Sequence, residues 1–92
     1  MFRQNELQEI DQEYFEVKEA SIYNIVLHSK STGHIWNIQS RELFLGKRTL
    51  VVLHKHHKSD QFHEQSKMHP KTVTEAQDMI KAHDVWHLNG RK

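Results

Sequence analysis

The most apolar stretch of the chain, residues 49–53, passes without a break into its densest group of histidines and lysines. Because apolar residues occupy consecutive positions there, both faces of a strand would be covered, by other elements or by a partner chain. Residues 49–57 are therefore predicted to form a central strand, followed by a long polar loop at residues 58–71. On this strand His54 and His56 point to the same face of the sheet.

Two more strands are predicted upstream of this run. Residues 21–29 and residues 34–39 are rich in β-branched and aromatic side chains, and the Lys-Ser-Thr-Gly sequence between them is a turn signal. A four-residue turn would place Leu27 opposite Trp36. That register collects five side chains on one apolar face: Tyr23, Ile25, Leu27, Trp36 and Ile38.

Helical periodicity is found near both ends of the chain. Residues 5–15 have Leu, Ile and Tyr at helical spacing and predict a short helix, although residues 14–17 would also suit a strand. Thr72 followed by Glu75 has the spacing of a capping box and begins a second predicted helix. Its buried residues would be Val73, Ala76, Met79, Ile80 and His83, and its exposed ones Thr74, Gln77, Asp78 and Lys81.

These elements follow the order α-β-β-β-α. Residues 84–88 have the composition of a short last edge strand, ended by Asn89-Gly90. The predicted fold class is α+β, a small antiparallel sheet of three to four strands with an N-terminal and a C-terminal helix. A chain of 92 residues fits a single domain over residues 1–92.

Charge is distributed unevenly along this domain. Residues 1–20 carry a net charge of −4, whereas residues 21–92 carry +5 and hold all nine histidines. The acidic segment could dock on the basic body or shield it from the wrong partner. The simplest interpretation is that its acids solvate the N-terminal helix.

Composition excludes several classes of protein. The chain has no cysteine, which removes disulfides, thiolate metal sites and cysteine nucleophiles. No apolar run approaches the roughly 20 residues of a membrane helix. We expect a soluble cytoplasmic protein that does not associate with membranes. Without a recognisable nucleophile or glycine-rich phosphate loop, binding is favoured over catalysis.

The histidines after the central strand suggest a metal site. His54 and His56 would lie about 6.5 to 7 Å apart along one face of the strand, a spacing that can chelate one ion. His63 or Glu64 could supply a third ligand if the loop folds back. The candidate ligands are His54, His56 and His63, for Zn²⁺ or another divalent metal, and no other cofactor is expected. Alternatively, His54 and His56 are half-exposed residues where the strand leaves the core.

Basic residues around the same histidines suggest an anionic partner, either nucleic acid or an acidic protein surface. Residues 46–71 carry a net charge of +4 and include an aromatic side chain. The candidate contact residues are Lys47, Arg48, Lys55, His57, Lys58, Phe62 and Lys67. An ordinary solvated lysine face is the alternative.

Three short segments resemble the small toxin ribonucleases of the RelE type. They are Val52-Leu-His-Lys55, Pro70 and Glu75-Ala76, and the resemblance covers at most a third of the chain. It implies a ribonuclease in which cationic or imidazole groups activate a ribose hydroxyl and stabilise the phosphorane. No residue is assigned as catalytic on this basis.

The leading functional hypothesis is therefore a small interaction domain whose basic, histidine-rich face meets an anionic partner. One alternative is a metal-dependent or RelE-like ribonuclease that uses His54 and His56. A second alternative is a structural homodimer in which a partner chain completes the central strand at residues 49–53.

Overall fold

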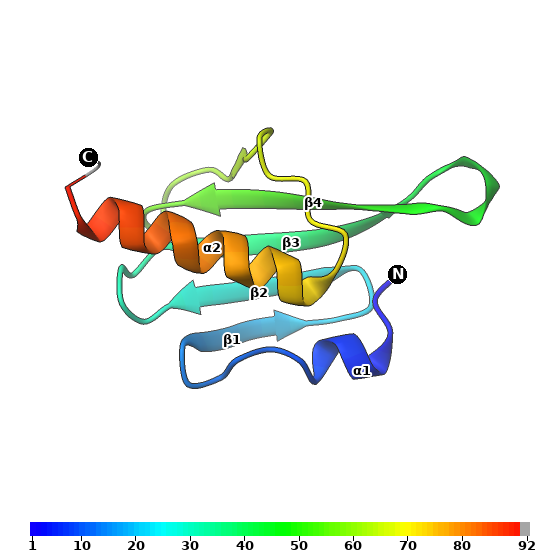
Figure 1. The fold of residues 1–92 in the computed structure, drawn as a ribbon, viewed down its shortest axis with the longest axis horizontal. Helices are drawn as coiled ribbons and strands as arrows, with labels where there is room; N and C mark the ends of the chain where they lie inside the picture. Colours follow the sequence, from blue (N-terminus) through cyan, green and yellow to red (C-terminus); the bar gives the residue numbers. More distant parts are fainter. Residues whose placement is uncertain (91–92) are drawn as a thin grey trace.

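Each strand of the sheet pairs with the strand that follows it along the chain, which makes an antiparallel meander (Figure 1). The computed structural model describes residues 1–90. The elements are β1 (Phe15–Ala20), β2 (Asn24–Ser29), β3 (Ile35–Glu42), β4 (Arg48–Lys55), β5 (His63–Glu64), α1 (Gln4–Leu7), the 3-10 turn η1 (Phe44–Gly46) and α2 (Val73–Leu88). The predicted α+β class is confirmed, with five strands in the sheet.

The predicted register between the first two expected strands is confirmed. Leu27 of β2 lies opposite Trp36 of β3, and Ile25 lies opposite Ile38. All four side chains are fully buried, as expected for the core face of an antiparallel sheet. Tyr23 is the exception, since its exposed fraction is 48%. It lies before β2 begins, so it is not held in the alternation of the strand.

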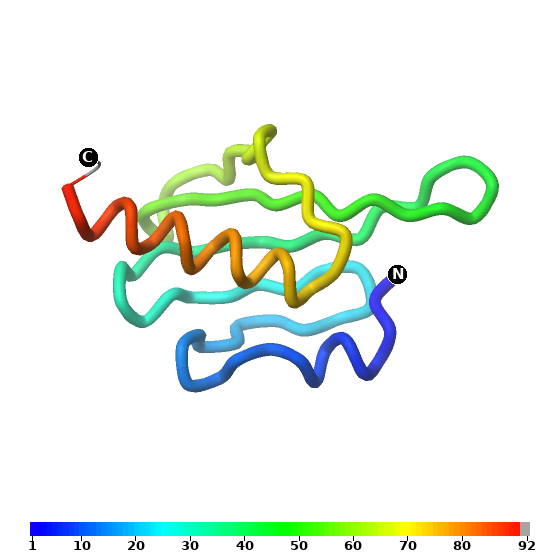
Figure 2. The backbone as a smooth tube through the Cα atoms, viewed as in Figure 1, coloured from blue at the N-terminus to red at the C-terminus, as the bar shows by residue number. Residues whose placement is uncertain are grey.

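The face formed by these residues is covered by α2, which crosses the sheet obliquely (Figures 1 and 2). Strand β4 contributes Leu50, Val52 and His54 to this buried face. Val51 and Leu53 point to the opposite face and are only partly buried. The expectation that other elements of the chain cover both faces of this strand is therefore wrong for the described residues. Apolar residues at consecutive positions here provide one buried face and one half-exposed face.

The second predicted helix begins as expected and extends further than expected. The Thr72 side chain accepts a hydrogen bond of 3.1 Å from the backbone N–H of Glu75. Residues 84–88 belong to α2, so the predicted edge strand is wrong. Asp84 lies one turn beyond Ile80 and both are fully buried, so the helical contact with the sheet continues past residue 83. No helix of residues 1–90 is long and apolar enough to cross a membrane.

Gln77 was predicted to face the solvent from α2, but its exposed fraction is only 3%. Its side-chain nitrogen donates to the carbonyl of Glu9 at 3.1 Å, and its side-chain oxygen accepts from the backbone N–H of Asp11 at 2.8 Å. The amide thus satisfies two backbone groups of the N-terminal segment. A polar residue can be buried at this position because both ends of its side chain are hydrogen-bonded.

The N-terminal segment is less helical than predicted. Helix α1 is a single turn, and the helix expected over residues 5–15 is wrong for most of its length. Asp11 starts a turn by accepting hydrogen bonds from the backbone N–H groups of Glu13 and Tyr14. The chain then enters β1 at Phe15, in agreement with the alternative prediction of a strand at residues 14–17.

Two acidic residues of this segment make ion pairs with the body of the protein. Glu6 pairs with Arg48, and Asp11 pairs with Lys81 at 2.9 Å. The simple solvation of an N-terminal helix therefore does not describe these two carboxylates. They attach the acidic segment to β4 and α2.

Candidate metal centre

Histidine side chains from three separate parts of the chain meet at one end of the sheet. Because β3 and β4 are antiparallel, the start of β3 lies beside the end of β4, and the C-terminal half of α2 reaches the same end (Figure 1). The rings in contact there, called the histidine cluster below, are those of His34, His54, His56, His83 and His87. Their contacting ring centroids lie between 4.2 and 5.7 Å apart.

The innermost contact of the cluster joins His34 and His54. Nε2 of His54 and Nδ1 of His34 lie 2.9 Å apart, so one nitrogen donates a proton and the other accepts it. The exposed fractions of the two residues are 4% and 6%. The ring of His54 also stacks on Trp36, with centroids 4.0 Å apart. These contacts fix both imidazoles against the core.

Burial keeps this inner pair uncharged. It lowers the pKa of His54 to about 3 and the pKa of His34 to about 4, and repulsion between neighbouring imidazolium charges acts in the same direction. Both rings are therefore neutral near pH 7. In each neutral imidazole one of the two ring nitrogens has a lone pair, and such a nitrogen can bind a metal ion.

Three members of the cluster converge closely enough to share one ion. The ligand nitrogens of His34, His54 and His56 all lie within 4.8 Å of one another. Zn–N bonds of about 2.0–2.1 Å in a tetrahedron place ligand nitrogens roughly 3.3 Å apart. For both facing nitrogens of the inner pair to bind, the ring that donates the 2.9 Å hydrogen bond has to carry its proton on its other nitrogen, and the pair has to open by a few tenths of an ångström. The ring of His56 is stacked on that of His34 with 9° between the planes, so it has to turn before its lone pair points to the same ion. His56 is exposed, which allows that movement and leaves the site open to the solvent.

A buried carboxylate stands beside the same imidazoles. Asp84 is fully buried, and its ligand oxygen lies within 4.8 Å of ligand nitrogens of His34 and His83. Asp84 accepts hydrogen bonds from the hydroxyls of Tyr14 at 2.6 Å and Thr32 at 3.2 Å. Carboxylates in such positions commonly orient metal-bound imidazoles. Burial and the hydrogen bond to Asp84 raise the pKa of Tyr14 to about 12, so the phenol keeps its proton.

The residues predicted as metal ligands are only partly brought together. His54 and His56 belong to the converging group, although His54 is buried rather than half-exposed. His63 is the direct partner of His54 across β4 and β5 and borders the same surface pocket. It is exposed, and neither converging group among the described residues includes it.

His34 is the residue that the sequence prediction missed. The period of two along a strand places it on the same face as Trp36, which was assigned correctly to the core. The missing information was the pairing of β3 with β4, which puts Trp36 opposite His54. A predicted pairing of these two strands would have placed His34 beside the candidate histidines.

The predicted basic face divides into separate groups. Lys47 and Arg48 lie at the start of β4, whereas Lys55, His57, Lys58 and Phe62 lie at or beyond its end. An eight-residue strand separates these groups by roughly 23 Å. Lys67 lies in the segment after β5. The residues therefore do not form one continuous basic surface.

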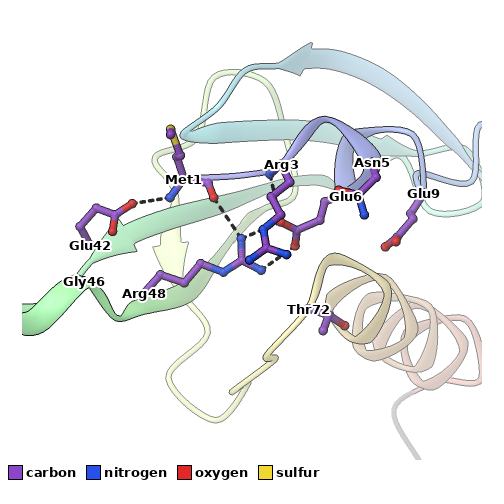
Figure 3. A pocket seen from close by; sticks show the side chains of 9 residues that line it. All are labelled: Met1, Arg3, Asn5, Glu6, Glu9, Glu42, Gly46, Arg48 and Thr72. Carbon is purple, nitrogen blue, oxygen red and sulfur yellow. Dashed lines mark hydrogen bonds and ion pairs between the residues drawn. The ribbon is translucent and has the colours of Figure 1, made fainter.

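Arg48 is also neutralised within the molecule. Its guanidinium donates to both carboxylate oxygens of Glu6, at 2.8 and 2.5 Å, and to the carbonyl of Met1 at 3.1 Å (Figure 3). The same pocket contains Glu9 and Glu42, so carboxylates line it as well as arginines. An anionic partner would have to displace these internal contacts to reach Arg48.

No family model, curated protein or solved structure matches this chain. The geometry of the histidine cluster is therefore the basis for assigning a function.

Proposed function

We propose that this protein binds a divalent transition-metal ion through His34, His54 and His56. The observation that carries this function is the convergence of their three ligand nitrogens within 4.8 Å. Imidazole nitrogen is a preferred ligand of Zn²⁺, Cu²⁺ and Ni²⁺, whereas Mg²⁺ and Ca²⁺ prefer oxygen ligands. Zn²⁺ is the first ion to test because a tetrahedral ion accepts three histidines.

Three protein ligands would leave a fourth position for water or another small ligand. Closed structural zinc sites fill all four positions with protein side chains, whereas open sites keep one for exchange. Here the exposed His56 marks the side from which solvent reaches the group. Asp84 and its two hydroxyl partners would hold the neighbouring imidazoles in orientation.

The proposal is tested by titrating the metal-free protein with Zn²⁺ in a calorimeter and by measuring bound zinc after dialysis. We expect one ion per chain. His56→Gln should weaken binding more than about 100-fold, because changes to residues that only orient the ligands already cost roughly 10–100-fold. Since His56 is exposed, this variant should keep its fold. His34→Gln should have the same effect, provided its circular dichroism spectrum is unchanged.

Two matched variants serve as controls. His69→Gln changes an exposed histidine outside the cluster and should leave zinc binding unchanged. His63→Gln tests the ligand set predicted from the sequence, which includes His63, against the set proposed here, which does not. This variant should alter the affinity for zinc less than about threefold. Absence of stoichiometric zinc in the wild type, or loss of binding in His63→Gln with retention in His34→Gln, would contradict the proposal.

The other functional hypotheses stay predictions. Binding of an anionic partner through the predicted basic residues is untested, and the residues at the start and at the end of β4 would have to act as separate groups. A ribonuclease that uses His54 and His56 and a homodimer that completes β4 are likewise untested. Strand β5 pairs with β4 only at Leu53 and His54.

A further inference from the structure

A hollow of about 500 Å³ lies on the face of the sheet opposite to α2. Its position follows from the register: His28, Ile35 and Lys55 are aligned across β2, β3 and β4, one residue out of phase with the side chains that contact α2. Loop residues after β4 form one of its sides. This hollow is separate from the inner pair of the histidine cluster, although His56 borders both.

The floor of the hollow is apolar. Val26 and Ile35 contribute partly buried side chains from β2 and β3, and Phe62 contributes its ring from the loop after β4. An apolar group seated there would remove these side chains from water. Such burial is favourable by roughly 25 cal/mol for each Å² covered.

The charged residues that line the hollow are all cationic: Lys18, Lys55 and Lys58. The Lys55 ammonium is positioned by a hydrogen bond of 3.1 Å to the carbonyl of Lys58 and lies 4.5 Å from the centre of the Phe62 ring. Among the ion pairs of residues 1–90, none involves Lys55 or Lys58.

Two carboxylates contact residues that line the hollow. Glu16 pairs with Lys18 at 2.8 Å and lies 3.6 Å from His28. Asp60 accepts a hydrogen bond of 3.1 Å from the backbone N–H of His57. The Asp60 carboxylate keeps its charge, since its partner is a neutral N–H, but it does not line the hollow, where Lys55 and Lys58 provide the positive charge that an incoming anion would meet.

We propose that this hollow binds a small amphipathic anion, with an apolar body on Val26, Ile35 and Phe62 and one anionic group at Lys55 and Lys58. A carboxylate, sulfonate or phosphate would each satisfy the two ammonium groups. A single nucleic-acid strand fits less well, since it needs cations along a path and free aromatic faces for stacking. Here the cations surround one hollow, and the Lys55 ammonium lies over the Phe62 ring.

The test uses a pair of dyes that share an apolar body and differ in charge. 8-Anilinonaphthalene-1-sulfonate carries the anionic group, and N-phenyl-1-naphthylamine lacks it. We expect saturable binding of the sulfonate dye to the metal-free protein. The double variant Lys55→Gln/Lys58→Gln should weaken binding of the sulfonate dye about tenfold and binding of the neutral dye less than twofold. Replacing Ile35 with Thr should weaken the binding of both dyes.

The matched control is Lys67→Gln/Lys71→Gln, which removes two lysines outside the hollow and should change neither affinity. Near-ultraviolet circular dichroism must stay the same in all variants, so that the dye reports the folded state. The proposal would be overturned if the two double variants lost equal affinity for the sulfonate dye. It would also be overturned if removing Lys55 and Lys58 lowered the affinity for both dyes equally. A single-stranded oligonucleotide that binds at low salt and depends on the same two lysines would overturn it as well.

This site is independent of the proposed metal function. Both dye titrations use the metal-free protein, so their outcome does not depend on a bound ion. If zinc does not bind, the proposal for the hollow still stands. If the dye does not bind, the proposal for the metal site still stands.

Discussion

Glu6 has an exposed fraction of only 8%, and its carboxylate pairs with the Arg48 guanidinium. The Arg48 guanidinium donates a hydrogen bond to each of its oxygens, a bidentate geometry that binds a carboxylate more tightly than a single contact. This pair lowers the pKa of Glu6 and raises that of Arg48. A single pair thus ties the first helical turn to the start of β4.

Replacing Glu6 with Gln should lower the free energy of unfolding at pH 7 by about 1–3 kcal/mol. The pKa of Glu6 in the folded protein lies below its usual value of 4.5, so the ion pair stabilises the fold above that pH. The contribution is lost as the pH falls through the lowered pKa. The difference between wild type and variant should therefore shrink between about pH 5 and pH 3.

Urea unfolding followed by circular dichroism at several pH values checks this expectation. Glu13→Gln changes an exposed acid of the same segment and should have little effect at any pH. A difference between wild type and Glu6→Gln that stays constant down to pH 3 would show that the ionised pair is not its source.

The β3–β4 hairpin extends beyond the rest of the molecule (Figure 2). Its tip is closed by a hydrogen bond from the N–H of Leu43 to the carbonyl of Lys47. Leu45 adopts a left-handed backbone with φ of 65°, followed by Gly46 at 73°. This conformation is unfavourable by roughly 1–2 kcal/mol for a residue with a Cβ, whereas glycine adopts it without that cost. The exposed fraction of Leu45 is 80%, so little burial offsets it.

Replacing Leu45 with Asn should raise the free energy of unfolding by about 0.5–1 kcal/mol, because Asn adopts the left-handed region more readily. Phe44→Asn is the matched control. It removes a side chain that is 87% exposed, but from a position without a positive φ, and it should bring no gain. Urea unfolding of the two variants gives the comparison. Equal effects would mean that side-chain exposure, and not backbone strain, determines the result.

At the scale of the whole molecule, the histidine cluster connects the ends of two strands with the last turns of α2. The His34 and His54 rings contact each other, and each also contacts a histidine ring of α2. His34 contacts His87, and His54 contacts His83 at 5.0 Å between centroids. An ion bound by His34, His54 and His56 would add a link across β3 and β4. Binding only to the folded state would then stabilise the entire fold.

Under the proposed function, Zn²⁺ at about 100 times its dissociation constant should raise the free energy of unfolding by roughly 2.7 kcal/mol. Thermal unfolding with and without zinc measures this gain. Mg²⁺ at the same concentration should give none, since it prefers oxygen ligands. His56→Gln should lose the zinc effect, while His69→Gln keeps it. An unchanged midpoint for the wild type would argue against a native zinc site.

Local patterns were sufficient for several features of this protein. The turn between β2 and β3, the pairing of Leu27 with Trp36 and the Thr72 cap of α2 each depend on residues close together in the sequence. The placement of His54 and His56 near the end of one strand follows from the same kind of local evidence. Propensity, turn chemistry and periodicity act over such short ranges.

Only the tertiary structure decided which residues complete the candidate site. His34 meets His54 across 20 positions of sequence, and Asp84 meets Tyr14 across 70. Gln77 is buried because it bonds to backbone groups more than 60 positions away, and α2 continues through Asp84 because the sheet lies beneath it. These contacts depend on how strands pair and where a helix packs, which local alternation of apolar and polar residues does not specify. The sequence determined the strand that carries two of the histidines, and the pairing of that strand with β3 determined their neighbours.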